Sequence, residues 1–187
     1  TSTANCVRVY TYDEKGKYTI PVRAMICSTG LDNSTITGDY TIGIKSEWLS
    51  LVGDVFGRYI SGISGDYLFH SVPYYSMSEE DLELEEFNKL GEQASQGCVR
   101  LAVSDAKWVY DNCPAGTNVS IYDDAENAGP LGKPDAIKIT DFTNKWDPTD
   151  SNKKCPYAKA TPIISGANDY TIKSGGEFYA LAGVTAV

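Results

Sequence analysis

The residues A-S-Q-G-C-V-R-L at positions 94–101 carry most of the information about fold and chemistry in this chain. Gly97 comes directly before Cys98, and because glycine has no side chain, a substrate can approach the thiol closely. The segment precedes a stretch with helical spacing, so backbone N–H groups near Cys98 are placed to hold a developing oxyanion. The pattern predicts an exposed nucleophilic cysteine on a loop just before a helix.

Such a cysteine needs a base, because a free thiol with a pKa of about 8.5 is only about 3% ionised at pH 7. Full ionisation at that pH requires roughly 2 kcal/mol of extra thiolate stabilisation, and a neighbouring histidine is its usual source. His70, within Leu68-Phe69-His70-Ser71-Val72-Pro73, is the single histidine of the chain. The residues alone leave two interpretations open, a Cys–His pair or a histidine satisfied in an apolar core.

Two short motifs, Phe69-His70-Ser71 and Ser95–Leu101, closely resemble the signature of the L,D-transpeptidase catalytic domain family (YkuD type). That signature is an upstream histidine followed by Ser/Thr-His-Gly-Cys. The resemblance covers roughly residues 5–123. Further blocks that look like family features are the N-terminal hairpin, Ser28-Thr29-Gly30, Thr37-Gly38, Gly57-Arg58-Tyr59, Asn88–Gly91 and Gly116–Val119.

The resemblance implies a role for each residue of the motifs. Cys98 is the nucleophile, and His70 is its base, oriented by the backbone carbonyl of Ser71. Backbone N–H groups of Gly97 and Cys98 are expected to form the oxyanion hole. The chain departs from the family pattern at Gln96, which replaces the motif histidine and cannot titrate. It also has a longer gap, 71–94, in which a helix over Ser78–Leu90 is expected to form a lid-like insertion.

The activity implied by the resemblance is a two-step acyl transfer on peptidoglycan. The cysteine attacks a donor stem tetrapeptide and releases D-alanine, and the amine of an acceptor stem then resolves the thioester into a 3→3 cross-link. No metal or organic cofactor is implied, and carbapenem β-lactams are expected to acylate the cysteine. Two alternatives remain, an L,D-carboxypeptidase that uses water and a non-catalytic cell-wall-binding module. A papain-like protease is disfavoured because its histidine follows its cysteine.

Four residues are candidate substrate-binding groups, each with a structural alternative. Arg100 is expected either to bind a stem-peptide carboxylate or to buttress the cysteine loop. Tyr59 lines the groove or packs as a strand aromatic. Ser95 orients the loop by hydrogen bonds or starts a turn, and Gln96 lines the site. The acidic run Glu79–Glu86 is interpreted as a solvated helix face, or else as an attractor for the acceptor's cationic amine.

Composition argues against several other classes of protein. The net charge of −9 and the lack of a Lys/Arg-rich run argue against binding to nucleic acid or to an anionic membrane surface. No apolar run approaches the roughly 20 residues of a membrane span, so no membrane insertion is expected within this segment. With one histidine and no C-x-x-C pair, no zinc site is expected. The group Asp141, Asp147 and Asp150 fits no calcium loop and is interpreted as linker composition.

Five cysteines raise the question of a reactive thiol in an exported protein. With Cys98 set aside, Cys27 and Cys113 are interpreted as buried small apolar residues, with disulfides as the alternative. The partners of Cys6 and Cys155 stay open.

The expected fold is mainly β with a few helices. Alternation in Val7–Val9 and Ile20–Ile26, around the turn Asp13–Gly16, predicts a β-hairpin. Together with the resemblance, this predicts the mixed β-sheets of an L,D-transpeptidase-like sandwich. Further strands are expected at 40–44, within 59–72 with an end near His70, at 117–122 and at 136–139, and helices at 78–90 and 104–113.

We expect three regions along the chain. Residues 1–125 form the catalytic domain and residues 126–161 an extension or linker. Residues 162–187 resemble the start of a bacterial immunoglobulin-like repeat, which cannot form its sandwich from one or two strands. The segment is interpreted as a piece of a longer, exported protein at the bacterial cell wall or in the extracellular space.

Overall fold

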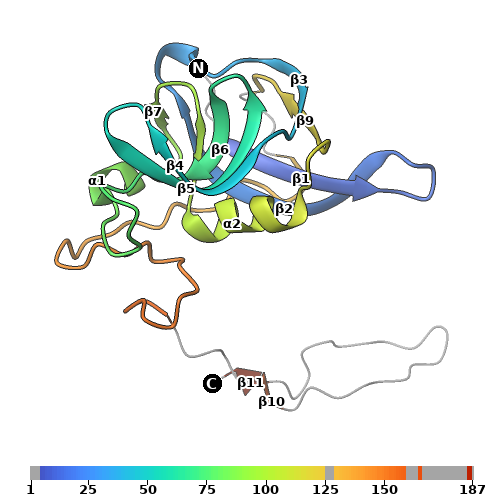
Figure 1. The fold of residues 1–187 in the computed structure, drawn as a ribbon. Coiled ribbons are helices and arrows are strands. Elements are labelled where there is room, and N and C mark those ends of the chain that lie inside the picture. Colours follow the sequence, from blue (N-terminus) through green and yellow to red (C-terminus); the bar gives the residue numbers. More distant parts are fainter. Residues whose placement is uncertain (1–4, 125–128, 159–163, 166–184, 187) are drawn as a thin grey trace.

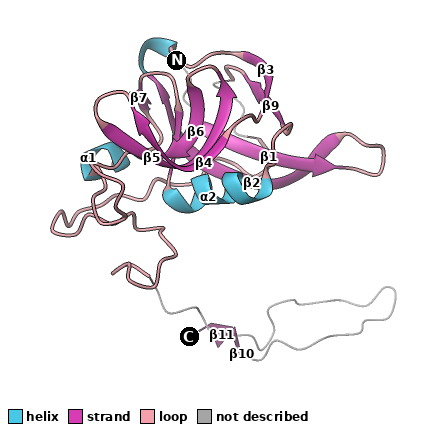
Figure 2. Cartoon of the chain, viewed as in Figure 1, coloured by secondary structure: helices cyan, strands magenta, loops and turns pink. Residues whose placement is uncertain are grey.

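The computed structural model describes residues 5–124, 129–158, 164–165 and 185–186 and is mainly β, as predicted (Figures 1 and 2). Its main sheet has the strand order β1-β2-β8-β6-β5-β4, and β7 pairs with β2. Most neighbours are antiparallel, whereas β6 with β8 and β2 with β7 are parallel. The strands of this sheet are β1 (Cys6–Tyr12), β2 (Tyr18–Gly30), β4 (Lys45–Leu51), β5 (Val55–Ser64), β6 (Tyr67–Ser71), β7 (Gln93–Ser95) and β8 (Val99–Leu101).

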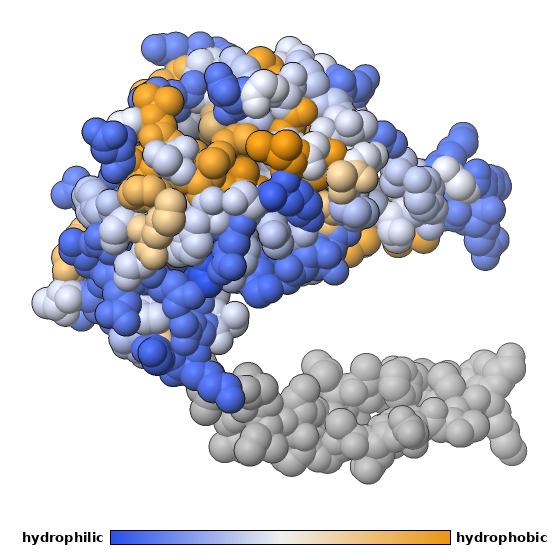
Figure 3. Space-filling view, in the orientation of Figure 1, coloured by the Kyte–Doolittle hydropathy of each residue, from blue (hydrophilic) through white to orange (hydrophobic). Residues whose placement is uncertain are grey.

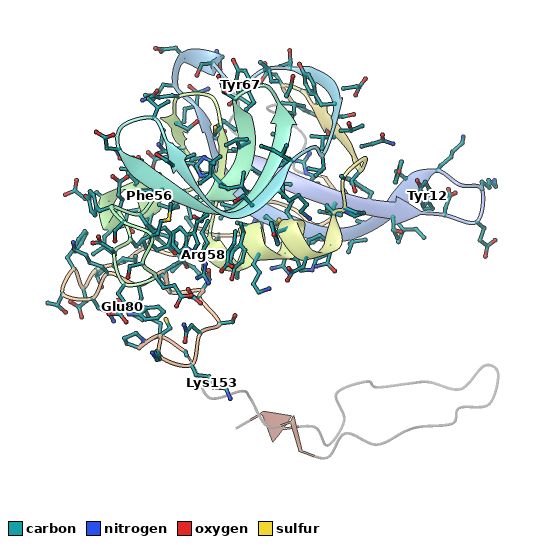
Figure 4. The ribbon with its side chains drawn as sticks, viewed as in Figure 1. Tyr12, Phe56, Arg58, Tyr67, Glu80 and Lys153 are labelled. Atoms are coloured by element: carbon teal, nitrogen blue, oxygen red, sulfur yellow. The ribbon has the colours of Figure 1, made fainter. Side chains whose placement is uncertain are left out.

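The predicted N-terminal hairpin is confirmed as β1 and β2, with Val7 opposite Met25 and Tyr12 opposite Tyr18. Its turn is held by the Asp13 carboxylate, which accepts hydrogen bonds from two backbone N–H groups, those of Lys15 and Lys17. The far end of the hairpin projects from the domain, and there the rings of Tyr12 and Tyr18 stack with centroids 4.2 Å apart (Figure 4). Figure 3 shows a hydrophilic surface at this tip and apolar surface gathered over the body of the domain.

Helix α2 (Val103–Asn112) is confirmed within one residue of its predicted start and end, and it packs against β5, β6 and β8. It buries Val103, Ala106 and Val109 because these positions recur on one helical face. The last two join a core cluster with Met25 and Leu101 of the main sheet. The helix therefore covers one side of the sheet directly after the cysteine-bearing segment (Figure 1).

A small two-stranded sheet also packs against this core cluster. It pairs β3 (Gly38–Thr41) with β9 (Asn118–Ile121), which confirms the predicted strand at 117–122. The strand predicted at 40–44 is displaced. It ends at Thr41: the Ile42 N–H still bonds to the carbonyl of Thr117 just before β9, but the N–H of Gly43 bonds to the carbonyl of Gly62 instead.

The predicted helix over Ser78–Leu90 is wrong, since only α1 (Leu84–Phe87) is helical, preceded by irregular chain. The backbone N–H of Leu82 donates to the carbonyl of Lys145, and that of Glu83 to the carbonyl of Pro73. These long-range bonds replace the local bonds of a helix. The apolar residues of this segment pack instead in a second core cluster. That cluster contains Tyr74, Leu82, Leu84, Phe87 and Leu90.

The predicted strand at 136–139 is also wrong. Ile139 is buried, but its backbone N–H and carbonyl both bond to the side-chain amide of Asn88, at 2.7 Å and 2.8 Å. One asparagine side chain thus provides the two hydrogen bonds that a neighbouring strand would have supplied.

Residues 136–158, which we call the C-terminal strap, lie along α1 and the start of α2. Trp146, Asp147 and Asp150 of the strap are buried. Asp147 bonds to the Val103 amide, and Asp150 forms an ion pair with Arg58 at 3.0 Å. The interpretation of Asp147 and Asp150 as linker residues is therefore wrong, because both make specific buried contacts.

The predicted immunoglobulin-like start at 162–187 lies outside the described residues, apart from a short antiparallel pair formed by β10 (Ile164–Ser165) and β11 (Thr185–Ala186). Neither helix in the described part of the chain has the length and apolar character needed to cross a membrane.

Candidate active site

The loop that carries Cys98 connects β7 to β8 at the centre of the main sheet. Gly97 has a φ of +134°, a conformation that side chains other than hydrogen rarely allow. A Cβ at this position would lie 2.8 Å from Cε1 of the Tyr67 ring, which is labelled in Figure 4. Only glycine fits there, so the G-C pair of the motif is required by both the local backbone and the packing.

Ser95 fixes the loop from inside. Its buried hydroxyl donates to the carbonyl of Cys98 at 2.6 Å and accepts the backbone N–H of Gly97 at 3.0 Å. These bonds favour the loop-orienting interpretation of Ser95 over a simple turn start. From the other side the Thr35 hydroxyl donates to the carbonyl of Gly97 at 2.8 Å and itself accepts the N–H of Gly30. The loop is held on both sides of the thiol-bearing residue.

His70 lies on β6, next to β8, and is buried. Its Nδ1 lies 2.6 Å from the carbonyl oxygen of Ser71, so Nδ1–H donates and the lone pair is left on Nε2. The Ser71 hydroxyl in turn donates to the carbonyl of Val72 and accepts the N–H of Arg58 at 2.9 Å. The expected orientation of the imidazole by the Ser71 carbonyl is therefore present in the structure.

Strand register relates the histidine to the cysteine. β6 and β8 are parallel, with Phe69 opposite Val99 and His70 opposite Arg100. Arg100 therefore lies on the same sheet face as His70, and Cys98 is in the loop directly before β8, two residues before Arg100. The Cys98 thiol itself lies 3.4 Å from the carbonyl of Asp66, to which S–H donates. The fold thus brings the cysteine loop next to the histidine strand, while the resting thiol proton points to the β5–β6 turn.

Burial sets the protonation state of both groups. It lowers the pKa of His70 to about 4, partly offset by the Ser71 hydrogen bond and reinforced by the positive charge of Arg100. It raises the pKa of the Cys98 thiol, which a Leu68 backbone hydrogen bond and the Arg100 charge partly oppose. At pH 7 the pair is therefore a neutral thiol and a neutral imidazole. A neutral imidazole is the form that can accept the thiol proton during attack.

The expected oxyanion hole is changed by one hydrogen bond. The backbone N–H of Gly97 is already used by the Ser95 hydroxyl, so it is not free to bind a developing oxyanion in this conformation. The N–H of Cys98 is therefore the candidate donor in this conformation, and the oxyanion hole formed by Gly97 and Cys98 stays a prediction.

Arg100 is directed away from solvent into the protein. Its Nη1 lies 2.5 Å from Glu86 Oε2 and donates to the carbonyl of Ala94 at 3.2 Å. These contacts favour the interpretation that Arg100 supports the cysteine loop over the interpretation that it binds a substrate carboxylate. Glu86 was missed as a site residue, because the acidic run was interpreted as a solvated face.

The remaining candidates are placed differently. Tyr59 contacts the ring of Tyr110, with centroids 5.7 Å apart, and lies under Arg58 and Lys107. This arrangement favours the packed-aromatic interpretation over a groove-lining one. Gln96, two residues before Cys98, is exposed, and its role as a lining residue stays a prediction.

The other cysteines do not resemble Cys98. Cys27 and Cys113 are buried, as predicted, and burial raises the pKa of both thiols. Cys155 is buried in the strap and Cys6 is half-buried, and all five are free thiols. Within residues 5–124 and 129–158, no cluster of three or more His, Cys, Asp or Glu side chains could hold a metal ion.

Several known proteins are similar to this chain. The candidate L,D-transpeptidase YciB of Bacillus subtilis is 37% identical over 118 residues, which are 59% of this chain and 59% of YciB. A fused zinc-dependent amidase/peptidase/peptidoglycan-binding domain-containing protein of Clostridium acetobutylicum has 31% identity and a TM-score of 0.48 over 64% of this chain and 48% of its own. The L,D-transpeptidase LdtMt1, solved in complex with imipenem, has 17% identity and a TM-score of 0.46 over 63% and 59%.

The chain thus spans only 59% of the length of its curated relative. The profile of the YkuD family, described as the L,D-transpeptidase catalytic domain, matches residues 2–121 and so includes both the histidine strand and the cysteine loop. This chain belongs to the YkuD family of L,D-transpeptidase catalytic domains.

Proposed function

We propose that this domain is a peptidoglycan L,D-transpeptidase that uses Cys98 as nucleophile and His70 as general base. The observation that carries the proposal is the buried imidazole, tied through Nδ1 to the Ser71 carbonyl at 2.6 Å, on the strand that pairs with the strand directly after the Cys98 loop. Family membership supports acyl transfer, and the geometry supports this pair as its centre.

In the first step the donor stem tetrapeptide acylates Cys98. Nε2 of His70 takes the proton of the Cys98 thiol as sulfur attacks the carbonyl of the third residue. The N–H of Cys98 stabilises the oxyanion. The tetrahedral intermediate collapses, the proton passes from the imidazolium to the departing amine, and D-alanine leaves. The product is a thioester on Cys98.

In the second step an amine of an acceptor stem attacks the thioester. The neutral imidazole again takes a proton, now from the amine, and returns it to the sulfur, so a 3→3 cross-link forms and the thiol is regenerated. Water as the acceptor would make the same site an L,D-carboxypeptidase. Gln96 is exposed and is expected to contact either acceptor, but it cannot serve as a second base.

The function places the domain where peptidoglycan is assembled, which is outside the bacterial membrane. Its partners are donor and acceptor stem peptides. Carbapenems are expected to bind covalently, because their strained lactam carbonyl is an acyl donor to the same thiol.

The proposal is tested with a purified disaccharide-tetrapeptide. Cross-linked dimer lacking one D-alanine is the expected product, and Cys98→Ser and His70→Gln should both abolish it. Tripeptide without dimer would favour the carboxypeptidase. If neither product forms while the domain sediments with peptidoglycan, the non-catalytic cell-wall-binding module, for which Gln96 is the motivation, replaces the enzyme.

A further inference from the structure

Glu86 is held on a well-packed part of the chain close to the proposed centre. It lies in α1 between Leu84 and Phe87, both buried in the second core cluster. Asn88, two residues after Glu86, is also anchored, since its side-chain amide bonds to the backbone of Ile139 in the strap. A carboxylate on so fixed a backbone can determine the position of whatever it binds.

Both carboxylate oxygens of Glu86 are used. Oε2 lies 2.5 Å from Nη1 of Arg100, and Oε1 lies 2.5 Å from Nζ of Lys89. The Arg100 side chain retains 15% of its exposure, so its ion pair is largely shielded from water, whereas the Lys89 side chain retains 48%. The pair with Arg100 is therefore the one expected to constrain geometry.

Arg100 joins the two ends of the cysteine loop. It follows Cys98 by two residues, and the same Nη1 that binds Glu86 donates to the carbonyl of Ala94, just before the loop begins. One guanidinium thereby links the residue before the loop to the strand after it. Arg100 is also the partner of His70 in the β6–β8 register.

We propose that Glu86 is a positioning residue that fixes Arg100 and, through it, the loop that presents Cys98 beside His70. The proposal rests on the proposed function, in which Cys98 is the nucleophile. It assigns a role to the segment between the two motifs, which delivers this carboxylate from 16 residues after His70.

A direct effect of the Glu86 charge on the Cys98 thiolate would change the alkylation rate in the opposite direction, so the two explanations can be distinguished. If Glu86 acted only through space, removing its negative charge would stabilise the Cys98 thiolate and speed alkylation. If it positions Arg100, removing it frees the guanidinium and slows reaction of the thiol. The charged groups near this centre are Asp66 on the β5–β6 turn, Glu83 and Lys89 beside α1, and Arg100 in the sheet, and His70 is a titratable group that is neutral at pH 7.

The experiment compares the full chain with its variants Glu86→Gln, Arg100→Gln, the double variant, and Glu85→Gln. Glu85 is the matched control, since it is an exposed acid next in sequence and its change alters net charge equally. The rate of alkylation of Cys98 by iodoacetamide is followed from pH 6 to 10 by mass spectrometry of the Cys98 peptide. Carbapenem acylation is measured in parallel, and thermal unfolding confirms that each variant is folded.

We expect Glu86→Gln and Arg100→Gln each to slow carbapenem acylation about tenfold, as for loss of one charge-assisted hydrogen bond. The double variant should be no slower than either single variant, because each substitution already breaks the same Glu86–Arg100 ion pair. The apparent pKa of Cys98 alkylation should rise in Glu86→Gln and stay unchanged in Glu85→Gln.

Faster alkylation in Glu86→Gln, equal behaviour of Glu86→Gln and Glu85→Gln, or additive losses in the double variant would overturn the positioning role. Those results are distinct from failure of the proposed function, which would appear as wild-type protein that carbapenem does not acylate.

Discussion

The carboxylate of Asp147 caps helix α2 from 44 residues further along the chain, with Oδ2 lying 2.8 Å from the backbone N of Val103. The helix has no side-chain cap of its own, because Ala102 occupies the N-cap position. Thr149 adds a second contact, since its hydroxyl accepts the N–H of Ser104 at 3.1 Å. The C-terminal strap therefore belongs to the same folded unit as the helix that follows the cysteine loop.

Asp147→Ala should lower the free energy of unfolding by about 2 kcal/mol, the upper range for loss of an N-cap, since a buried N–H loses its partner. Asp147→Asn should cost much less, because an amide oxygen can still accept from Val103. Urea denaturation at pH 7 measures both. Asp141→Ala is the control, since that exposed carboxylate bonds only to Thr143. Equal losses for all three variants would contradict the capping role.

The pH dependence of acylation should reflect the buried state of His70. With a pKa lowered to about 4, the imidazole is neutral and basic throughout the range from pH 5 to 8. The rate of carbapenem acylation should therefore fall on the acid side only near pH 4. Stopped-flow absorbance of the carbapenem chromophore measures this limb. A midpoint near the ordinary histidine value of about 6.5 would show that the imidazole is not buried as described.

Stability should respond to pH through two buried groups with opposite signs. For His70, the folded pKa of about 4 is below the unfolded value, so its contribution is lost as pH falls from about 6.5 to 4. For Asp147, burial raises the folded pKa to about 6, so stability is lost as pH rises from about 4 to 6. Each is worth about 3 kcal/mol, and in the wild type they nearly cancel.

Single variants should reveal the two opposing slopes. Relative to wild type, His70→Gln should become less stable as pH rises from 4 to 6, and Asp147→Asn more stable. Urea unfolding at pH 4, 5, 6 and 7 measures both. Parallel pH profiles for wild type and both variants would disprove the assigned pKa values.

Gly97→Ala should slow acylation and destabilise the fold by more than about 1 kcal/mol, because the new Cβ would lie 2.8 Å from the Tyr67 ring and strain the backbone. Gly16→Ala is a matched control, with a positive φ of +73° but no atom within 4 Å of the new Cβ. Thermal unfolding and carbapenem acylation compare the two. Equal effects would mean that backbone strain alone, and not the contact with Tyr67, requires glycine.

Local sequence was sufficient to predict the elements whose hydrogen bonds are local. The β1–β2 hairpin and helix α2 follow from alternation, turn residues and helical spacing, and they match within a residue or two. The Cys98 loop and the His70 strand were predicted from their motifs, and the orientation of the imidazole by Ser71 is present in the structure.

Long-range contacts explain what could not be predicted. The backbone of Leu82 and Glu83 bonds to distant segments, so the apolar spacing of this region gives a second core instead of a long helix. The burial of Asp147 depends on α2 needing a cap, which nothing near either residue in sequence indicates. Glu86 was overlooked for the same reason, since its partner Arg100 lies 14 residues away on a central strand.

The most direct test of the central claim, that Cys98 and His70 form an acylating pair, is intact-protein mass spectrometry of the reduced protein with a carbapenem. Wild type should gain the mass of one β-lactam, Cys98→Ala should gain none, and His70→Gln should gain it far more slowly. Folded, reduced wild type that forms no adduct, or Cys98→Ala that still forms one, would contradict the account.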